Sequence, residues 1–132
     1  MSTILQKSIN YSMELFNDSL NAHQHFAFIF RRNKLISIGQ NETTSTDNRG
    51  RKIAKRFGAK KHVEYPFIHA EVDAISRNWG VTCLSKKHQL VSIRLNSHRE
   101  LRMSKPCNDC NLIIKSLGIR VVYFDGKNFV YE

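Results

Sequence analysis

The sequence is short of the features that mark several protein classes. Its 132 residues include only three cysteines and two prolines. Three cysteines cannot all pair within one chain, so we expect free thiols in a reducing compartment or metal ligands, not a disulfide scaffold. No apolar run approaches the roughly 20 residues that a membrane span needs, and residues 1–10 do not resemble a signal peptide. We therefore expect one cytoplasmic domain over residues 1–132, with no membrane partner.

Acidic residues are also few. The chain has eleven Asp and Glu against 21 Lys and Arg, so its net charge is +10. Such a field attracts anions, including nucleotides and nucleic acid. Residues 40–61 have little apolar content, so we expect a long surface loop there, with at most a short helix near 53–57. This segment could contact phosphate or a nucleic-acid backbone, or form only a solvated face. Its basic residues are Arg49, Arg51, Lys52, Lys55, Arg56, Lys60 and Lys61.

Apolar spacing predicts three helices. The first carries one apolar face through Leu5, Ile9, Met13, Phe16 and Leu20. The second starts at His69 and ends at Gly80, and its spacing places Trp79 in the core. The third starts at Cys107 and ends at Gly118, because glycine favours a helix end.

Five short strands are predicted at residues 26–30, 34–38, 90–95, 119–124 and 128–131. Residues 90–95 alternate between apolar and polar, which is typical of a half-buried strand. Only a short turn at Asp125 and Gly126 separates the last two strands, so we expect them to be antiparallel. The order of elements predicts a mixed α/β domain with a sheet of about five strands and helices on its faces.

Cys107 and Cys110 are spaced to hold one metal ion. They lie three residues apart at a predicted helix start, where the positive end of the helix favours thiolates. One such pair is a weak signal, because a structural zinc site needs four protein ligands. We expect Cys83 to be a buried apolar thiol and not a ligand.

His69 is the best candidate for a third ligand, because it also opens a predicted helix. One imidazole and two thiolates leave the fourth tetrahedral position for water, which describes a catalytic zinc. Glu71 lies close enough to reach that water and is placed for proton transfer. The joint pattern, His-x-Glu followed by Pro-Cys-x-x-Cys, is the known signature of zinc-dependent nucleobase deaminases.

With these motifs the chain resembles the cytidine and deoxycytidylate deaminase superfamily, and most of all the small deoxycytidylate deaminase-like proteins that phages encode. The resemblance covers about residues 26–123 and is carried by residues 39–41, 69–75 and 104–110. It implies the three-layer α/β fold of cytidine deaminases. It also implies a Zn²⁺ cofactor held by His69, Cys107 and Cys110, with Glu71 as the catalytic residue.

The reaction implied by the resemblance is hydrolytic deamination of cytosine to uracil in a nucleotide such as dCMP. Zinc-bound hydroxide adds to C4 of the base, while Glu71 carries a proton to N3 and then to the leaving amine. The resemblance also implies three substrate contacts. Asn41 would hold the sugar, the Ala70 backbone N–H would bind pyrimidine O2, and the Ser104 carbonyl would accept from the amine.

The sequence leaves other functions open. The charge of +10 favours the same chemistry on single-stranded DNA or RNA, whereas the small size and the resemblance favour a free nucleotide. Deamination of adenosine in tRNA shares the motif and is a weaker alternative. A binding module that keeps zinc only for stability is a further class, and Glu71 argues against it. A homo-oligomer is compatible with the sequence.

Overall fold

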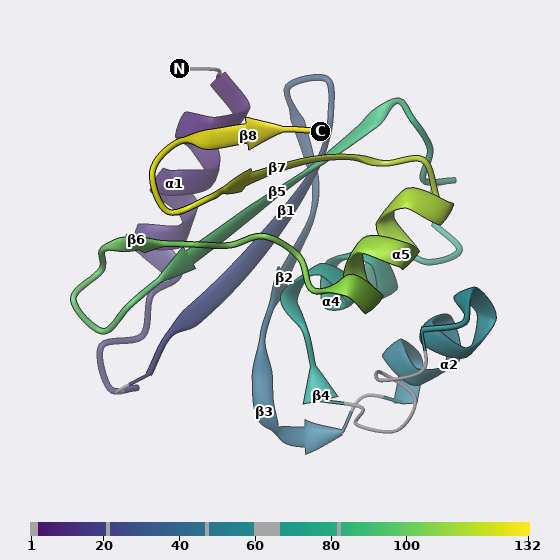
Figure 1. Ribbon diagram of the computed structural model, residues 1–132, viewed down its shortest axis with the longest axis horizontal. Helices are drawn as coiled ribbons and strands as arrows, with labels where there is room; N and C mark the ends of the chain where they lie inside the picture. Colours follow the sequence, from purple (N-terminus) through teal and green to yellow (C-terminus); the bar gives the residue numbers. More distant parts are fainter. Residues whose placement is uncertain (1–2, 21, 47, 60–66, 82) are drawn as a thin grey trace.

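The fold is built around a mixed sheet of six strands (Figure 1). A computed structural model describes residues 3–20, 22–46, 48–59, 67–81 and 83–132. Five strands follow one another in the order β2-β1-β5-β7-β8, and β6 pairs with the end of β5. Their bounds are β1 Gln24–Arg31, β2 Lys34–Gln40, β5 His88–Leu95, β6 Leu101–Arg102, β7 Arg120–Phe124 and β8 Phe129–Tyr131.

Strand directions in the sheet are mixed. β1 pairs antiparallel with both β2 and β5, whereas β5 and β7 are parallel. β7 and β8 are antiparallel, which confirms the pairing predicted for the end of the chain. The predicted mixed α/β class is therefore confirmed, with the short β6 added to the five strands expected.

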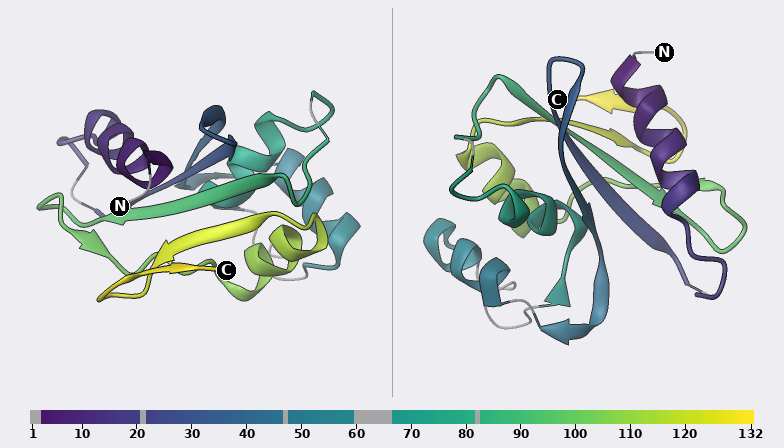
Figure 2. Two further views of the ribbon diagram at one scale, coloured as in Figure 1. Left: turned by 90° about the horizontal axis from the view of Figure 1, so that it is seen from above. Right: turned by 180° about the vertical axis from the view of Figure 1, so that it is seen from behind.

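Helices cover both faces of this sheet (Figure 1). Alternate residues of β1 serve two cores, because successive side chains of a strand point to opposite faces. Phe26, Phe28 and Phe30 pack with α1, whereas Ala27 and Ile29 pack with α4 and α5. α2 packs against α4 and α5, on the side away from α1 (Figure 2). The helices span Thr3–Leu15 (α1), Asn48–Phe57 (α2), Ala70–Arg77 (α4) and Asn108–Ser116 (α5).

Two predicted helices end earlier than their apolar spacing indicates. α1 stops at Leu15, and Leu20, predicted on its apolar face, is 52% exposed. α4 stops at Arg77, so Trp79 leaves the helical phase and is 37% exposed instead of lying in the core. Its ring meets the Phe57 ring edge-on at 6.2 Å and lies 5.6 Å from the Arg56 guanidinium carbon.

The segment predicted as a long loop is largely ordered structure. It contains β3 (Glu42–Thr46) and α2, and β3 pairs with β4 (Phe67–Ile68). The short helix expected near residues 53–57 is the second half of α2. Ile53 and Ala54 bury α2 against the core. Phe57 also packs against the core, but all three apolar residues lie in the second half of α2, so the first half has no apolar period and the pattern indicated a loop there.

β5 is covered on both faces and is not half-buried as predicted. Ser92, expected on a solvent face, is fully buried, and Arg94 is the exposed residue of segment 90–95. A buried serine in a central strand needs hydrogen-bond partners, which lie in the site described below. Among the described residues, no helix combines the length and the apolar character that crossing a membrane requires.

Candidate metal centre

The end of β2 sets the position of α4. The strand predicted at residues 34–38 extends to Gln40, and Gly39 lies against α4. A Cβ atom at Gly39 would overlap the Ala70 carbonyl oxygen and the Ala74 backbone. Ser37 Oγ donates to the Ala74 carbonyl at 2.7 Å. The first turn of α4 is therefore pinned to β2 by close backbone approach and by hydrogen bonding.

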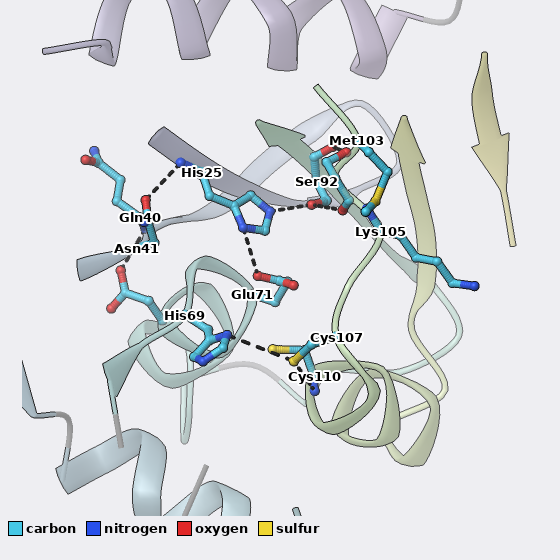
Figure 3. A network of polar contacts seen from close by, with 12 residues as sticks. His25, Gln40, Asn41, His69, Glu71, Ser92, Met103, Lys105, Cys107 and Cys110 are labelled. Atoms are coloured by element: carbon cyan, nitrogen blue, oxygen red, sulfur yellow. Dashed lines mark hydrogen bonds and ion pairs between the residues drawn. The ribbon is translucent and has the colours of Figure 1, made fainter. Parts of the chain in front are cut away.

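The N-termini of α4 and α5 face each other (Figure 3). His69 is the N-cap residue of α4, and Cys107 is the N-cap residue of α5. The Cys107 thiol accepts from the Cys110 backbone N–H at 3.4 Å, so it caps its own helix. Both residues occupy the helix starts predicted for them.

His69, Cys107 and Cys110 form a cluster that could hold a metal ion. Their ligand atoms lie within 4.8 Å of one another, and Cys107 Sγ is 4.0 Å from His69 Nδ1. One imidazole and two thiols are compatible with a metal such as zinc, which takes N and S ligands at about 2.0–2.3 Å. Cys110 is buried and Cys107 exposed, so the cluster is open on one side. Cys83, predicted to be buried, is exposed and lies outside this cluster.

The cluster has the electrostatics of a site for a cation. The hydrogen bond with the Cys107 thiol raises the pKa of His69. The neighbouring Cys107 thiol, followed by burial and the nearby Glu71 carboxylate, raises the pKa of Cys110 well above its usual value. Two thiolates and a carboxylate in such a small volume repel one another. A bound cation would relieve that repulsion, because metal ligation stabilises the deprotonated thiol.

Glu71 is the second residue of α4 and is only 1% exposed. Its Oε1 atom is buried without a hydrogen-bond partner in the described part of the chain. His25 Nδ1 lies 3.6 Å from this atom, and the Cys110 thiol also interacts with the Glu71 carboxylate. Burying a carboxylate oxygen unsatisfied is costly, so such a group marks a functional site more often than a core.

His25 and Ser92 belong to the site, although sequence reasoning gave neither a role. His25 Nε2 lies 2.6 Å from Ser92 Oγ, which donates to the Ser104 carbonyl at 2.7 Å. Ser104 Oγ in turn donates to the Ser92 carbonyl at 2.7 Å. Burial lowers the pKa of His25, with Glu71 opposing the shift, so the ring is neutral near pH 7. One signal was present in the sequence. His25 is two residues before Ala27 and four before Ile29, so on a strand all three side chains point to the same face, which α4 and α5 cover.

The residues expected to contact substrate lie around this cluster. Ala70 opens α4 and is fully buried. Ser104 is buried, and its hydroxyl accepts from the Phe124 N–H at 2.9 Å. Asn41 lies beside His25 (Figure 3), and its Oδ1 accepts from the His25 N–H at 2.8 Å. The Asn41 Nδ2 hydrogens have no partner among the described residues.

Most of the predicted basic segment forms the helix α2 and is not a loop. Arg51, Lys52 and Lys55 are exposed on this helix, and Arg56 stacks on Trp79. Lys60, Lys61 and the Arg49 side chain lie outside the described part of the structure. The described cations of α2 therefore line the outer surface of the helix layer.

Comparisons with protein-family models, with curated proteins and with solved structures found no significant match to this chain.

Proposed function

We propose that the protein has a cytidine deaminase-like fold and is a zinc-dependent enzyme that converts cytosine to uracil in a nucleotide such as dCMP. One observation carries this proposal: a buried, unpartnered carboxylate oxygen on Glu71 adjoins three metal-ligand side chains from two helix N-termini. A purely structural metal site has no use for such a group. Hydrolysis needs it, because a proton must move from water to the leaving group.

The residues divide the chemistry among them. Zinc, when bound by His69 and the two thiolates, supplies Lewis-acid activation of water at neutral pH. Glu71 would take one proton from water and deliver it to N3 of the base as the hydroxyl adds to C4. It would then carry the proton of that C4 hydroxyl to the exocyclic amine, which leaves as ammonia and produces the C4 carbonyl of uracil. The Ala70 N–H, at the positive end of α4, binds the pyrimidine O2. The Nδ2 group of Asn41 binds the sugar.

His25 is a positioning residue for Glu71 in this proposal. The Ser92 hydroxyl has one hydrogen, which it donates to the Ser104 carbonyl at 2.7 Å, and His25 Nε2 lies 2.6 Å from the same hydroxyl oxygen. If the hydrogen points to His25, the neutral ring carries its own hydrogen on Nδ1 and presents it to Glu71 Oε1. The Ser104 carbonyl is then free to accept from the substrate amine. A single hydroxyl rotation thus prepares both the base and the amine acceptor.

The decisive experiment measures metal and turnover separately. We expect the purified protein to contain about one zinc per chain and to release ammonia from dCMP, with uracil product detected by mass spectrometry. Glu71→Gln should keep the zinc and lose ammonia release, whereas Glu14→Gln, an exposed carboxylate on α1, should change neither. Turnover retained by Glu71→Gln would refute the assignment. Zinc without turnover on dCMP, CMP, deoxycytidine, cytidine or a cytosine-containing strand would leave the binding-module alternative.

A further inference from the structure

A second concentration of positive charge lies far from the metal cluster. It comes from three segments: the β1–β2 turn, the residues before β5 and the first residue of β7. The pairing of Arg31 with His88 and of Gln89 with Arg120 brings these segments together at one end of the sheet (Figure 1). We call this surface the basic groove. Its six cations, all exposed, are Arg31, Arg32, Lys34, Lys86, Lys87 and Arg120.

The surface is hollowed and its charge is uncompensated. A hollow of about 560 Å³ is lined by Arg31, Arg32, Lys86, Lys87, Gln89 and Arg120. None of the six cations forms an ion pair with any residue that the structure describes. Glu132 lies beside Arg120 in an adjoining hollow, where its carboxylate accepts from the Tyr123 hydroxyl at 3.1 Å. The groove therefore presents free guanidinium and ammonium groups to an anion.

Arg32 occupies the first position of the two-residue turn that joins the paired residues Arg31 and Lys34 of the β1–β2 hairpin, and turns of this kind require a positive φ there. Arg32 has φ +57°, in the left-handed region that favours glycine or asparagine. Arg99 has a similar φ of +60°, but its guanidinium binds Asp18 at 2.8 Å and stacks 4.9 Å from the Phe16 ring. Arg32 has no such partner among the described residues. The hairpin turn accounts for the positive φ, and it holds the exposed Arg32 side chain at the turn beside the other cations of the groove.

An exposed aromatic ring extends the groove. Tyr131 is 56% exposed and lines the adjoining hollow of about 340 Å³ together with Gln89 and Arg120. Cations that track a backbone beside an aromatic ring that stacks a base are the common design of single-strand binding surfaces. A membrane-binding surface would instead need a row of exposed apolar side chains beside its cations. The hollow of about 560 Å³ is lined by Arg, Lys and Gln, and the adjoining hollow adds Val121, Val122, Tyr131 and Glu132.

We propose that the basic groove binds the phosphate backbone of a single-stranded nucleic acid, with one base stacked on Tyr131. His25 and Arg31 are six residues apart on β1, so the groove lies about 20 Å from the candidate active site. A mononucleotide cannot span that separation. If the proposed deamination holds, the groove makes a polynucleotide, not only a free nucleotide, the substrate class of the same site.

The test uses the full-length protein, fluorescein-labelled single strands that contain one cytosine, and fluorescence anisotropy over a salt series. Arg32→Gly removes a charge and also relieves the left-handed strain, so it should bind several-fold more weakly without lowering Tm. It should also reduce the slope of log K against log salt by about 0.7, the value of one phosphate contact on a single strand. Lys127→Gln, at the opposite end of β7, is the matched control and should leave binding unchanged.

Tyr131 offers an independent pair of variants. Tyr131→Ala should weaken binding by about five-fold or more through lost stacking, whereas Tyr131→Phe should retain it. Unchanged affinity in both Arg32→Gly and the double variant Lys86→Gln/Lys87→Gln would overturn the proposal. Tighter binding to vesicles that contain anionic lipid than to the strand would overturn it as well.

Turnover assays distinguish a failure of the groove proposal from a failure of the proposed deaminase function. The groove variants should lower kcat/KM for the strand and leave dCMP turnover unchanged, because the groove lies outside the catalytic site. Binding that depends on the groove in a protein with no turnover on any cytosine substrate would refute the deaminase assignment and leave the groove assignment standing.

Discussion

Replacing His25 with alanine removes the ring nitrogen that lies 3.6 Å from Glu71 Oε1 and the imidazole partner of the Ser92 hydroxyl. The Glu71 carboxylate would then lose the imidazole that lies 3.6 Å from its Oε1 atom, so its orientation would be less restricted. A positioned proton carrier contributes about 10²–10⁴-fold to rate. Loss of its orientation, with the carboxylate still present, should cost part of that factor, roughly 10–100-fold in kcat.

The assay separates positioning from folding and from metal binding. His25→Ala should leave KM for dCMP within about two-fold and zinc content at the wild-type value, because His25 contacts neither the cluster ligands nor the substrate. Loss of one hydrogen bond should reduce the free energy of unfolding by about 0.5–1.5 kcal/mol. His25→Gln, whose amide can both donate and accept, should recover part of kcat. A kcat unchanged in His25→Ala, or lost together with zinc, would refute the positioning role.

Three further outcomes follow from the geometry. Cys110→Ser should abolish stoichiometric zinc in metal analysis, because a hydroxyl replaces the buried thiolate of a site with only two sulfur ligands. Gly39→Ala should lower the free energy of unfolding by roughly 3 kcal/mol or more in urea titrations, because its Cβ meets the α4 backbone, and wild-type stability would contradict the packing. Burial lowers the pKa of His25, so the unfolded state binds its proton first and folding stability falls as pH drops below about 6.5. His25→Gln should weaken that acid-side loss relative to wild type, and an identical pH dependence would show that His25 is not buried as described.

The metal cluster could be predicted from the sequence because its information is local. Cys107 and Cys110 lie within one helical turn, and Glu71 is two residues after His69 in the sequence. Helix starts can be recognised from capping residues and apolar spacing, so the cluster of His69, Cys107 and Cys110, which could hold a metal ion, was predicted without knowledge of the fold. The antiparallel end of the sheet was equally local, since a turn at Asp125 and Gly126 leaves no room for a crossover.

Only the tertiary structure decided what supports that cluster. His25 and Ser92 are 67 residues apart, and nothing local to either residue indicates that β1 and β5 place their side chains together. Only the second half of α2 was predicted, because its apolar residues Ile53, Ala54 and Phe57 all lie there. Trp79 is exposed because α4 ends before reaching it. The basic groove is assembled from three distant segments by strand pairing. Spacing along a chain determines which residues share one turn or one strand face, whereas contacts between elements depend on register and packing, which exist only in the folded protein.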